Sequence, residues 1–582
     1  MALLPALANA QAEFIVKGDC TPVFTTDAAT GTTAAARQRR LPAVKNTWDP
    51  TRTYRQAVIL VSFADTDFNT DDPHTLYDNM FNLHGFNSRD GAGCVADYFR
   101  DQSGGMFNVQ FDVYGPIKVS SNAQPYSNPN EDTRNFGHDV FVEATKKAID
   151  SLHIDFTPYD WNHTGRVNQV IFVYAGLTGN QSSSKCYGHI WPNTSTISTI
   201  TTNGIRISDY SASAEQWYNG ASCGIGTILH EYSHSLGLPD IYPTASSAGY
   251  SIMDEWDLMD GGNFTNYGWC PPNYTPMEKF LLGWLTPVDL SQPQTINNLK
   301  PASEGGEVYR IKHTDSEWLF LENRQQTGWD LGTPGKGLLI YHVYYDRTRW
   351  AGNIVNNDKS KRGYNLVAAD NMDYDQWYDY LMTWEMPKLY ANSNHMNSHI
   401  FSTSPYPWVI DSMQFVNDRL TDVSTPPARM NYANAKGSTL LSKSVTNIVQ
   451  NEDGTVSFDF MNDAPKCATP TITYEKGRIY FDCETEGATF VSKVTSAGST
   501  ESEGADVALV TQYTITVYAV LDGYINSDTV TATLRCDAGK MSGENISIID
   551  TTYKTGDVNE DGTVDVADIS SVITIMANDI QE

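Results

Sequence analysis

The stretch His-Glu-Tyr-Ser-His-Ser-Leu-Gly-Leu-Pro-Asp, residues 230–240, decides how this chain is interpreted. On a helix, His230 and His234 lie on one face because they are four residues apart, so both imidazoles can bind one metal ion. Gly237 predicts the end of that helix, since glycine accepts a left-handed conformation without steric penalty. The turn then returns Asp240 to the histidines as a third ligand. Two imidazoles and one carboxylate, with a fourth position left open, are typical of a catalytic zinc site.

The residues around this stretch favour a buried helix. Apolar side chains fall at 225, 228, 229, 232 and 236, which is the spacing of one helical face. Gly237 and Pro239 then stop the helix directly after this stripe. The competing interpretation is a surface helix that carries two histidines and holds no metal.

Glu231 lies between the two histidines and is predicted to act as a general base. A bound zinc ion lowers the pKa of its water toward neutrality and polarises the carbonyl of the bond to be cleaved. Glu231 would take a proton from that water and later pass it to the leaving amine. The remaining histidines have no comparable spacing, so we expect them to be surface or packing residues. The pattern therefore points to a zinc-dependent hydrolase.

The extended motif His-Glu-x-x-His-x-x-Gly-x-x-Asp at 230–240 resembles the immune inhibitor A family of secreted bacterial metalloproteases, which belongs with the metzincin-like enzymes. In such enzymes a methionine in a tight turn lies beneath the zinc ligands. The block Glu-Trp-Asp-Leu-Met-Asp-Gly-Gly at 255–262 makes Met259 the expected counterpart, with Met253 as the weaker competitor. Further segments that fit the resemblance lie at 57–63, 97–104, 274–284, 321–324 and 334–343, so we expect it to cover about residues 50 to 460.

Two positions differ from common metzincin patterns. The third ligand position holds Asp240, where metzincins often carry a histidine, and aspartate is an ordinary oxygen ligand of zinc. Within the resembled family this aspartate is expected. Some metzincins use a tyrosine two residues after the turn methionine, and here that position is Gly261. The sequence therefore does not identify a second group that stabilises the transition state.

A second motif lies near the carboxyl terminus, where residues 557–568 read Asp-Val-Asn-Glu-Asp-Gly-Thr-Val-Asp-Val-Ala-Asp. It predicts a calcium loop of the EF-hand type, because oxygen side chains occupy loop positions 1, 3, 5, 9 and 12 and Gly562 allows the sharp turn at position 6. Thr563 would contribute its backbone carbonyl at position 7. The predicted calcium ligands are Asp557, Asn559, Asp561, Thr563, Asp565 and Asp568.

This tail resembles the first repeat of a type I dockerin, a small calcium-dependent docking module, and aspartate at position 12 fits that resemblance. The resemblance implies a cohesin-type partner. Dockerins usually have two such repeats and this sequence shows one, so we expect either a truncated chain or a degenerate tail. The alternative is a calcium-stabilised cap that binds no partner.

The six residues Asn-Glu-Asp-Gly-Thr-Val occur twice, at 451–456 and at 559–564. Around the first copy, Val449 and Phe460 occupy two of the matching ligand positions and cannot supply oxygen atoms. We therefore predict that the first copy is the turn of a β-hairpin rather than a calcium loop. The strands of this hairpin are expected at 445–449 and 456–460.

Composition narrows the class of protein. The 582 residues include 39 basic and 69 acidic side chains, so the formal net charge is −30, which argues against a nucleic-acid partner. No stretch is long and apolar enough to form a transmembrane segment. Residues 1–12 resemble the end of a secretory signal, so we expect a secreted or cell-surface protein. The eight cysteines permit disulfides in such a compartment, but their pairing cannot be deduced.

We predict an α+β multidomain chain. Strand patterns at 57–63 and 168–175, with a helical pattern at about 136–152 between them, indicate a mixed sheet with helices before the zinc helix. Alternation after residue 467 indicates a β-sandwich. The expected parts are a signal remnant (1–12), a prosegment or its remnant (13–52), a metzincin-like zinc protease domain (53–300), its β-rich continuation (301–462), a small β-sandwich (463–545) and a dockerin-like calcium-binding tail (546–582).

The sequence thus favours a secreted zinc endopeptidase that acts on protein or peptide substrates. The alternative is a non-catalytic surface or adhesion protein on the same scaffold, docked through its calcium-dependent carboxyl-terminal module. Glu231 favours the enzyme, because a structural metal site has no need of a base. Cys20 could cap the zinc in a latent form, since thiolate is a good zinc ligand, although a lone cysteine is more often unrelated.

Overall fold

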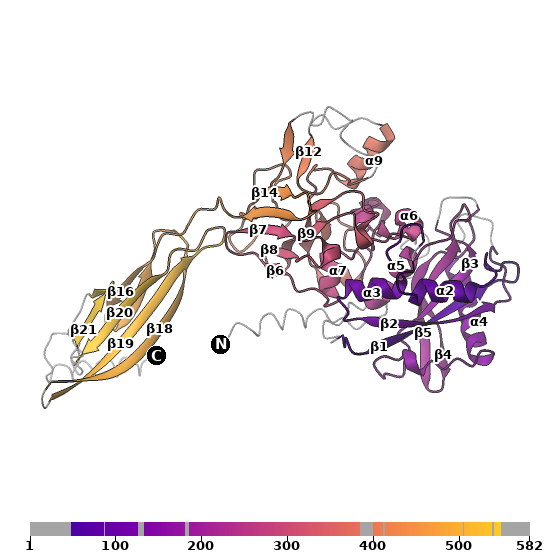
Figure 1. The fold of residues 1–582 in the computed structure, drawn as a ribbon, viewed down its shortest axis with the longest axis horizontal. Helices are drawn as coiled ribbons and strands as arrows, with labels where there is room; N and C mark the ends of the chain where they lie inside the picture. Colours follow the sequence, from indigo (N-terminus) through magenta and orange to yellow (C-terminus); the bar gives the residue numbers. More distant parts are fainter. Residues whose placement is uncertain are drawn as a thin grey trace, which may run out of the picture. The chain divides into compact units, whose positions relative to one another are not determined.

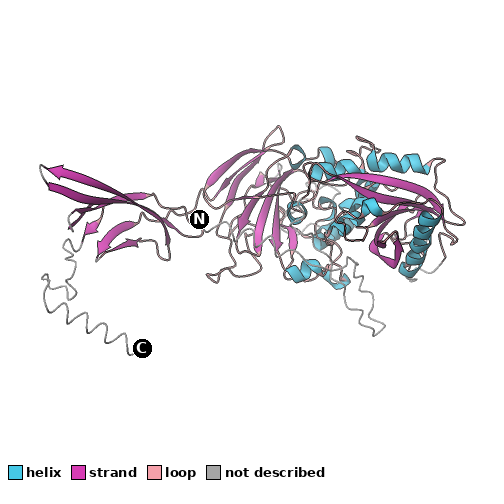
Figure 2. Cartoon of the chain, turned by 90° about the horizontal axis from the view of Figure 1, so that it is seen from below, coloured by secondary structure: helices cyan, strands magenta, loops and turns pink. Residues whose placement is uncertain are grey.

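The computed structural model describes residues 48–86, 88–125, 133–180, 185–383, 400–410, 414–475, 477–503, 506–537 and 540–548. Two compact units divide near residue 460 (Figure 1). The first comprises the chain up to residue 459, apart from residues 292–294 and 442–444. The second comprises these two short segments and the chain from residue 460 onward. In Figure 2 the helices are confined to the first unit, whereas the described part of the second consists of strands and loops.

The first unit begins with a mixed five-stranded sheet in the order β2-β1-β3-β5-β4. Four of its strands are parallel, and β4 pairs with β5 in the antiparallel direction at the edge. The strands predicted at 57–63 and 168–175 are confirmed as β1 and β3. Both are buried along almost their whole length, because each face of the sheet is covered. The strand bounds are β1 (Thr53–Ser62), β2 (Asn108–Lys118), β3 (Val170–Leu177), β4 (Asn193–Thr202) and β5 (Ile205–Gln216).

Helices cover the two faces of this sheet. In β1, residues 57, 59 and 61 pack in one hydrophobic cluster with α4, whereas residues 58 and 60 pack in another with α2, α3 and α5. This division follows from the strand period of two, which sends successive side chains to opposite faces. The predicted helix at about 136–152 is confirmed as α4. The helices are α2 (Pro73–Asn82), α3 (Val95–Gln102), α4 (Arg134–Asp150) and α5 (Gly226–Leu236).

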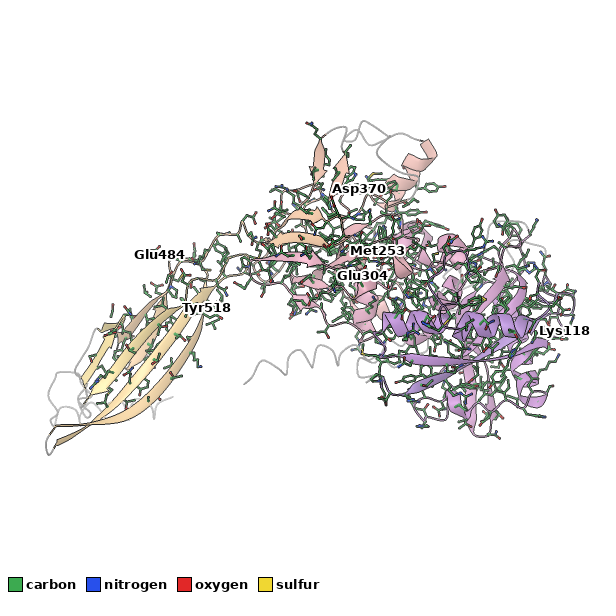
Figure 3. All side chains as sticks on the ribbon, viewed as in Figure 1. Lys118, Met253, Glu304, Asp370, Glu484 and Tyr518 are labelled. Atoms are coloured by element: carbon green, nitrogen blue, oxygen red, sulfur yellow. The ribbon has the colours of Figure 1, made fainter. Side chains whose placement is uncertain are left out.

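A second five-stranded sheet, in the order β11-β10-β9-β8-β6, follows in the same unit. Its strands β9 and β10 share one hydrophobic cluster with α5 and the first sheet, so the β-rich segment and the α5 helix have a common core. Met253, labelled in Figure 3, is fully buried in that core. The strands are β6 (Val288–Asp289), β8 (Tyr309–Lys312), β9 (Glu317–Arg324), β10 (Gly337–Tyr344) and β11 (Tyr364–Leu366).

Smaller elements complete the first unit. The predicted hairpin at the first Asn-Glu-Asp-Gly-Thr-Val copy is confirmed, because β14 and β15 are neighbours and Asn451 N donates to Thr455 O at 2.8 Å. The remaining strands are β7 (Gln294–Leu299), β12 (Trp408–Ile410), β13 (Phe415–Asn417), β14 (Val445–Gln450) and β15 (Val456–Phe460). The remaining α-helices are α6 (Thr265–Gly268), α7 (Pro276–Leu281), α8 (Arg347–Ala351) and α9 (Tyr374–Thr383).

The second unit is a small two-sheet structure, as the alternating pattern predicts. A three-stranded sheet, β17-β16-β22, and a four-stranded sheet, β18-β19-β20-β21, share an apolar core that includes Ile472, Ile515 and Leu534. Tyr518 on β19 is labelled in Figure 3. The strands are β16 (Thr471–Glu475), β17 (Arg478–Asp482), β18 (Thr489–Glu503), β19 (Asp506–Val520), β20 (Val530–Asp537), β21 (Lys540–Glu544) and β22 (Ser547–Ile548).

Several predictions fall on parts of the chain that are not described. The calcium loop at 557–568, the signal remnant at 1–12 and Cys20 all lie outside the described residues. Where the chain is described, no helix combines the length and the apolar character that a membrane span requires.

A buried ion-pair network around Arg324 joins the two sheets of the first unit. The Arg324 side chain is fully buried on β9, and its Nε donates to Asp330 Oδ2 at 2.7 Å. Asp330 also accepts from Asn273 N at 2.9 Å and from Asn273 Nδ2 at 2.7 Å. Gln102 at the end of α3 donates in turn to Asn273 Oδ1 at 2.7 Å. The helix layer of the first sheet is therefore hydrogen-bonded, through Asn273 and Asp330, to the second sheet.

Replacing Arg324 by alanine is expected to destabilise the first unit by about 3–5 kcal/mol, because Asp330 and Glu322 would stay buried without their counter-charge. The control is Arg55→Ala, since Arg55 pairs with Asp112 on the surface and such pairs contribute about 1 kcal/mol or less. Urea unfolding followed by tryptophan fluorescence compares the two. Equal losses of unfolding free energy in both variants would contradict the role given to Arg324.

Candidate metal centre

Helix α5 carries the metal-binding motif through the centre of the first unit. Residues 226 to 234 are all buried, so the helix is enclosed on every side rather than only along the predicted apolar stripe. Gly226 lies so close to the neighbouring chain that a Cβ there would sit 2.1 Å from Asn263 O. Gly237 has a φ of 106° and ends the helix, as predicted. The chain can therefore turn back toward the helix within three residues.

The turn brings the three predicted ligands together. Asp240 Oδ1 lies 3.3 Å from His230 Nε2 and 3.1 Å from His234 Nε2, and all three side chains are buried. Two ligands of one tetrahedral zinc ion, each about 2.0–2.2 Å from it, are themselves about 3.3–3.6 Å apart. The donor types therefore fit zinc, and the separations of 3.3 Å and 3.1 Å are at and slightly below the expected range. In the described part of the chain, no other group of three His, Cys, Asp or Glu residues offers ligand atoms within 4.8 Å of one another.

Backbone carbonyls orient both imidazoles. His230 Nδ1 lies 2.8 Å from Leu258 O, and His234 Nδ1 lies 2.8 Å from Leu238 O. Each Nδ1 therefore donates a proton to a carbonyl, which leaves the Nε2 lone pair available to a metal. Burial lowers the pKa of His230, but the hydrogen bond to Asp240 and the charges of Glu231 and Asp240 outweigh it, so the pKa is raised overall. The surrounding carboxylates thus favour a positive charge at this point.

Two residues that hold the site were not found from the sequence. Thr194 on β4 places its Oγ1 2.9 Å from Glu231 Oε2 and 2.6 Å from the Glu231 carbonyl. Asn353, which follows α8, accepts from Asp240 N at 2.7 Å and donates to Asp240 Oδ2 at 2.6 Å. Both lie far from the motif in the sequence, each with other polar residues nearby, and neither lies in a pattern that could have identified it.

The aromatic ring of Tyr242 also lies near the metal ligands. It is half-buried and nearly parallel to the His230 ring, with the ring centroids 6.4 Å apart. Tyr242 follows Asp240 by two residues, so the irregular segment that supplies the third ligand also supplies this ring. The position at which some metzincins carry a tyrosine, two residues after the turn methionine, holds Gly261 instead.

The Met259 turn packs against both parts of the motif. Leu258 O is the carbonyl beside His230, and Met259 O accepts from Ile241 N at 2.8 Å. Met259 itself is fully buried. Met253 is equally buried, but its backbone N bonds to Asp260 at 2.7 Å rather than to the segment that carries Asp240. The backbone contacts therefore favour Met259 over Met253 as the turn methionine.

A pair of buried carboxyl groups lies behind this turn. Asp257 Oδ1 accepts from Met259 N at 2.6 Å, and the Asp257 side chain is hydrogen-bonded to that of Glu278 on α7. Burial raises the pKa of Asp257 well above its usual range and raises that of Glu278 to about 7. Burial thus favours the protonated form of both groups, which lowers the negative charge buried behind the turn.

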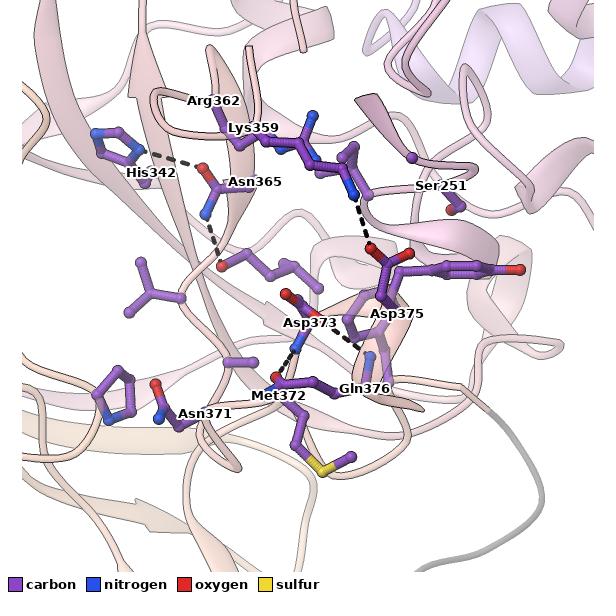
Figure 4. A pocket seen from close by; sticks show the side chains of 18 of the residues that line it. Ser251, His342, Lys359, Arg362, Asn365, Asn371, Met372, Asp373, Asp375 and Gln376 are labelled. Atoms are coloured by element: carbon purple, nitrogen blue, oxygen red, sulfur yellow. Dashed lines mark hydrogen bonds and ion pairs between the residues drawn. The ribbon is translucent and has the colours of Figure 1, made fainter. Parts of the chain in front are cut away.

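Two cavities lie apart from the metal centre. One, of about 550 Å3, is lined by Ser251, His342, Lys359, Arg362 and Asp375, among others (Figure 4). The other, of about 510 Å3, lies between α4 and the strands β4 and β5 and includes two arginines. None of the three metal ligands lines either cavity.

Comparison with known proteins agrees with this geometry. Residues 179–279 match the model of the family described as immune inhibitor A peptidase M6, catalytic domain, and this range contains the three ligands, Glu231 and Met259. Immune inhibitor A of Bacillus thuringiensis subsp. alesti is 25% identical over 311 residues, which are 44% of each chain. The pre-pro-metalloprotease PrtV of Vibrio cholerae serotype O1 is 22% identical over 382 residues, 53% of this chain and 41% of that protein. The chain spans less than half the length of these relatives. These similarities support a metalloprotease of the immune inhibitor A type.

Proposed function

We propose that this protein is a zinc-dependent endopeptidase whose metal ligands are His230, His234 and Asp240. The observation that supports the proposal is the meeting of these three buried side chains around one point, with the carboxylate of Glu231 on the same helix. Zinc, when bound, polarises the scissile carbonyl and lowers the pKa of the attacking water. The meeting of two imidazoles and one carboxylate fits a catalytic centre, in which one coordination position stays open.

Glu231 is the general base in this proposal. It takes a proton from the attacking water and passes it to the leaving amine. The Thr194 hydroxyl lies 2.9 Å from Glu231 Oε2 and supports this role by fixing the direction of the carboxylate. Met259 is the turn methionine of a metzincin-like centre, and its contacts with Ile241 support that assignment.

Further parts of the proposal rest on the sequence. The signal-like residues 1–12 support a secreted or cell-surface location, where the enzyme would meet protein or peptide substrates. The motif at 557–568 supports a calcium loop in the tail, and its dockerin resemblance supports a cohesin-type partner. A non-catalytic adhesion protein is the competing function, and the hydrogen-bonded Glu231 disfavours it.

Glu231→Gln is expected to keep the zinc content of the wild type and to lower the rate of casein cleavage at least about 100-fold, because the amide cannot accept the proton. Zinc content by elemental analysis and casein hydrolysis are measured on the same preparations. Glu304→Gln, at an exposed glutamate labelled in Figure 3, is the matched control and should cleave at the wild-type rate. Wild-type turnover by Glu231→Gln would refute the assigned base, and zinc-loaded wild type without turnover would favour the non-catalytic alternative.

Thr194→Val removes the hydroxyl that holds Glu231 while preserving the shape of the side chain. A hydrogen bond to a charged group contributes about 1.5–3 kcal/mol, so we expect kcat to fall about 10- to 100-fold with the zinc content unchanged. Thr199→Val, at an exposed position of the same strand, is the control. The kcat of both variants is measured with a quenched fluorescent peptide. An unchanged kcat for Thr194→Val would show that Glu231 does not depend on this contact.

Zinc added to the metal-free protein is expected to raise its unfolding temperature, because an ion bound only by the folded state stabilises that state, by about 2.7 kcal/mol at one hundred times the dissociation constant. His230→Asn should abolish this response. His153→Asn, at an exposed histidine with a left-handed backbone that asparagine tolerates, should retain it. The unfolding temperatures of the wild type and both variants are measured at increasing zinc concentrations. An equal response of both variants would place the zinc elsewhere.

A further inference from the structure

The third ligand lies in a segment without regular secondary structure. Residues 238–245, between the end of α5 and the first short helical turn after it, form neither a helix nor a strand. His230 and His234 are held by the helix itself, but Asp240 is not. Its position must therefore come from contacts with other parts of the chain.

Those contacts are made by Asn353. The Asn353 side chain is 2% exposed, accepts from Asp240 N at 2.7 Å and donates to Asp240 Oδ2 at 2.6 Å. The residue has a φ of 57°, a left-handed conformation that asparagine adopts more readily than most residues. An amide is the side chain that offers an acceptor to the backbone N–H and a donor to the carboxylate at once. The residue type therefore matches both groups that it meets.

This arrangement separates the two carboxylate oxygens of Asp240. Oδ2 accepts the hydrogen bond from Asn353, whereas Oδ1 is the atom 3.3 Å and 3.1 Å from the two imidazole Nε2 atoms. Asn353 thus determines which oxygen is turned to the metal. Hydrogen bonds from neighbouring residues to a metal ligand fix the orientation of that ligand. Loss of such a bond typically lowers metal affinity by about 10- to 100-fold.

The loop that carries Asn353 holds the rest of the segment too. Thr244 Oγ1 donates to Asn353 O at 2.8 Å, Asn356 Nδ2 donates to Ile241 O at 2.8 Å, and Ala245 N donates to Asn357 Oδ1 at 3.1 Å. The loop is itself braced, because Asn356 Oδ1 accepts from the backbone N–H groups of residues 363 and 364 at 2.9 and 3.0 Å. A chain segment more than one hundred residues downstream therefore shapes the metal centre.

We propose that Asn353 is a positioning residue of the zinc centre, which fixes Asp240 so that only its Oδ1 binds the metal. The proposal rests on the proposed zinc function. It extends the centre beyond the matched residues 179–279 and makes the loop at 353–357 a part of it. A zinc protease unit that ends before this loop would contain all three ligands and still bind the metal weakly.

The test is zinc affinity, measured on the full-length protein by competition with a chromophoric chelator. Asn353→Asp keeps the acceptor for the backbone N–H but turns an oxygen toward the Asp240 carboxylate, so the zinc dissociation constant should rise about 10- to 100-fold. Asn353→Gly removes the side chain and tolerates the left-handed backbone, so it should weaken zinc binding as well. The matched controls are Asn371→Asp and Asn371→Gly, since Asn371 is exposed and has a φ of 55°. Their zinc affinity should equal that of the wild type.

A double-mutant cycle separates positioning from general stability. In an Asp240→Ala background, Asn353→Asp should cause no further loss of zinc affinity, because the ligand that it orients is gone. The unfolding temperature of each metal-free variant is recorded alongside. If Asn353→Asp does not fold, the zinc affinity of Asn353→Gly is used for the test instead. A dissociation constant within twofold of the wild type in both Asn353 variants, or an undiminished effect without Asp240, would overturn the proposal. A wild type that binds no zinc would overturn the proposed function, and the positioning role with it.

Discussion

The buried guanidinium of Arg324 is the charge on which the packing of the first unit depends. Its full burial is tolerable because Asp330 and Glu322 surround it, and an unpaired charge in this position would be strongly destabilising. Its field also reaches Glu278: burial raises the pKa of that carboxyl to about 7, and the Arg324 charge opposes the rise. Glu278 bonds to Asp257, and Asp257 bonds to the backbone of Met259. The charge of Arg324 therefore acts on the Glu278–Asp257 pair, and this pair is hydrogen-bonded to the turn that carries Met259.

The three proposed metal ligands are held in two different ways. The histidines are spaced by α5 and oriented by carbonyl oxygens, so the helix and the Leu258 turn fix two ligands with little help from side chains. Asp240 has no such frame and depends on the Asn353 amide. Of the three proposed ligands, Asp240 is therefore the one least fixed by secondary structure. Its position depends on the loop at 353–357.

The sequence predicted the structural features that depend only on residues near one another in the chain. The α5 helix, its end at Gly237 and the hairpin at residues 451–456 follow from periodicity and from glycine conformation, and all are found. Thr194 and Asn353 could not be predicted, because each meets its partner across 37 and 113 residues respectively and carries no pattern of its own. The apolar stripe predicted that α5 is buried, but it did not predict that the polar motif residues on the other faces of the helix are buried as well. The calcium loop stays a prediction because its residues lie outside the described part of the chain.

The direction of the Glu231 side chain bears on the choice between an enzyme and a structural metal site. A structural zinc site closes all four positions with protein ligands, and such a site would have gained from a second carboxylate as its fourth ligand. Glu231 is on the same helix as both histidines, yet its Oε2 is 2.9 Å from the Thr194 hydroxyl, and it does not belong to the group of ligand atoms within 4.8 Å of one another. A carboxylate that is buried on the same helix as the two histidines and tied to a hydroxyl is available to accept a proton. This arrangement is the one that the proposed hydrolytic function requires of Glu231.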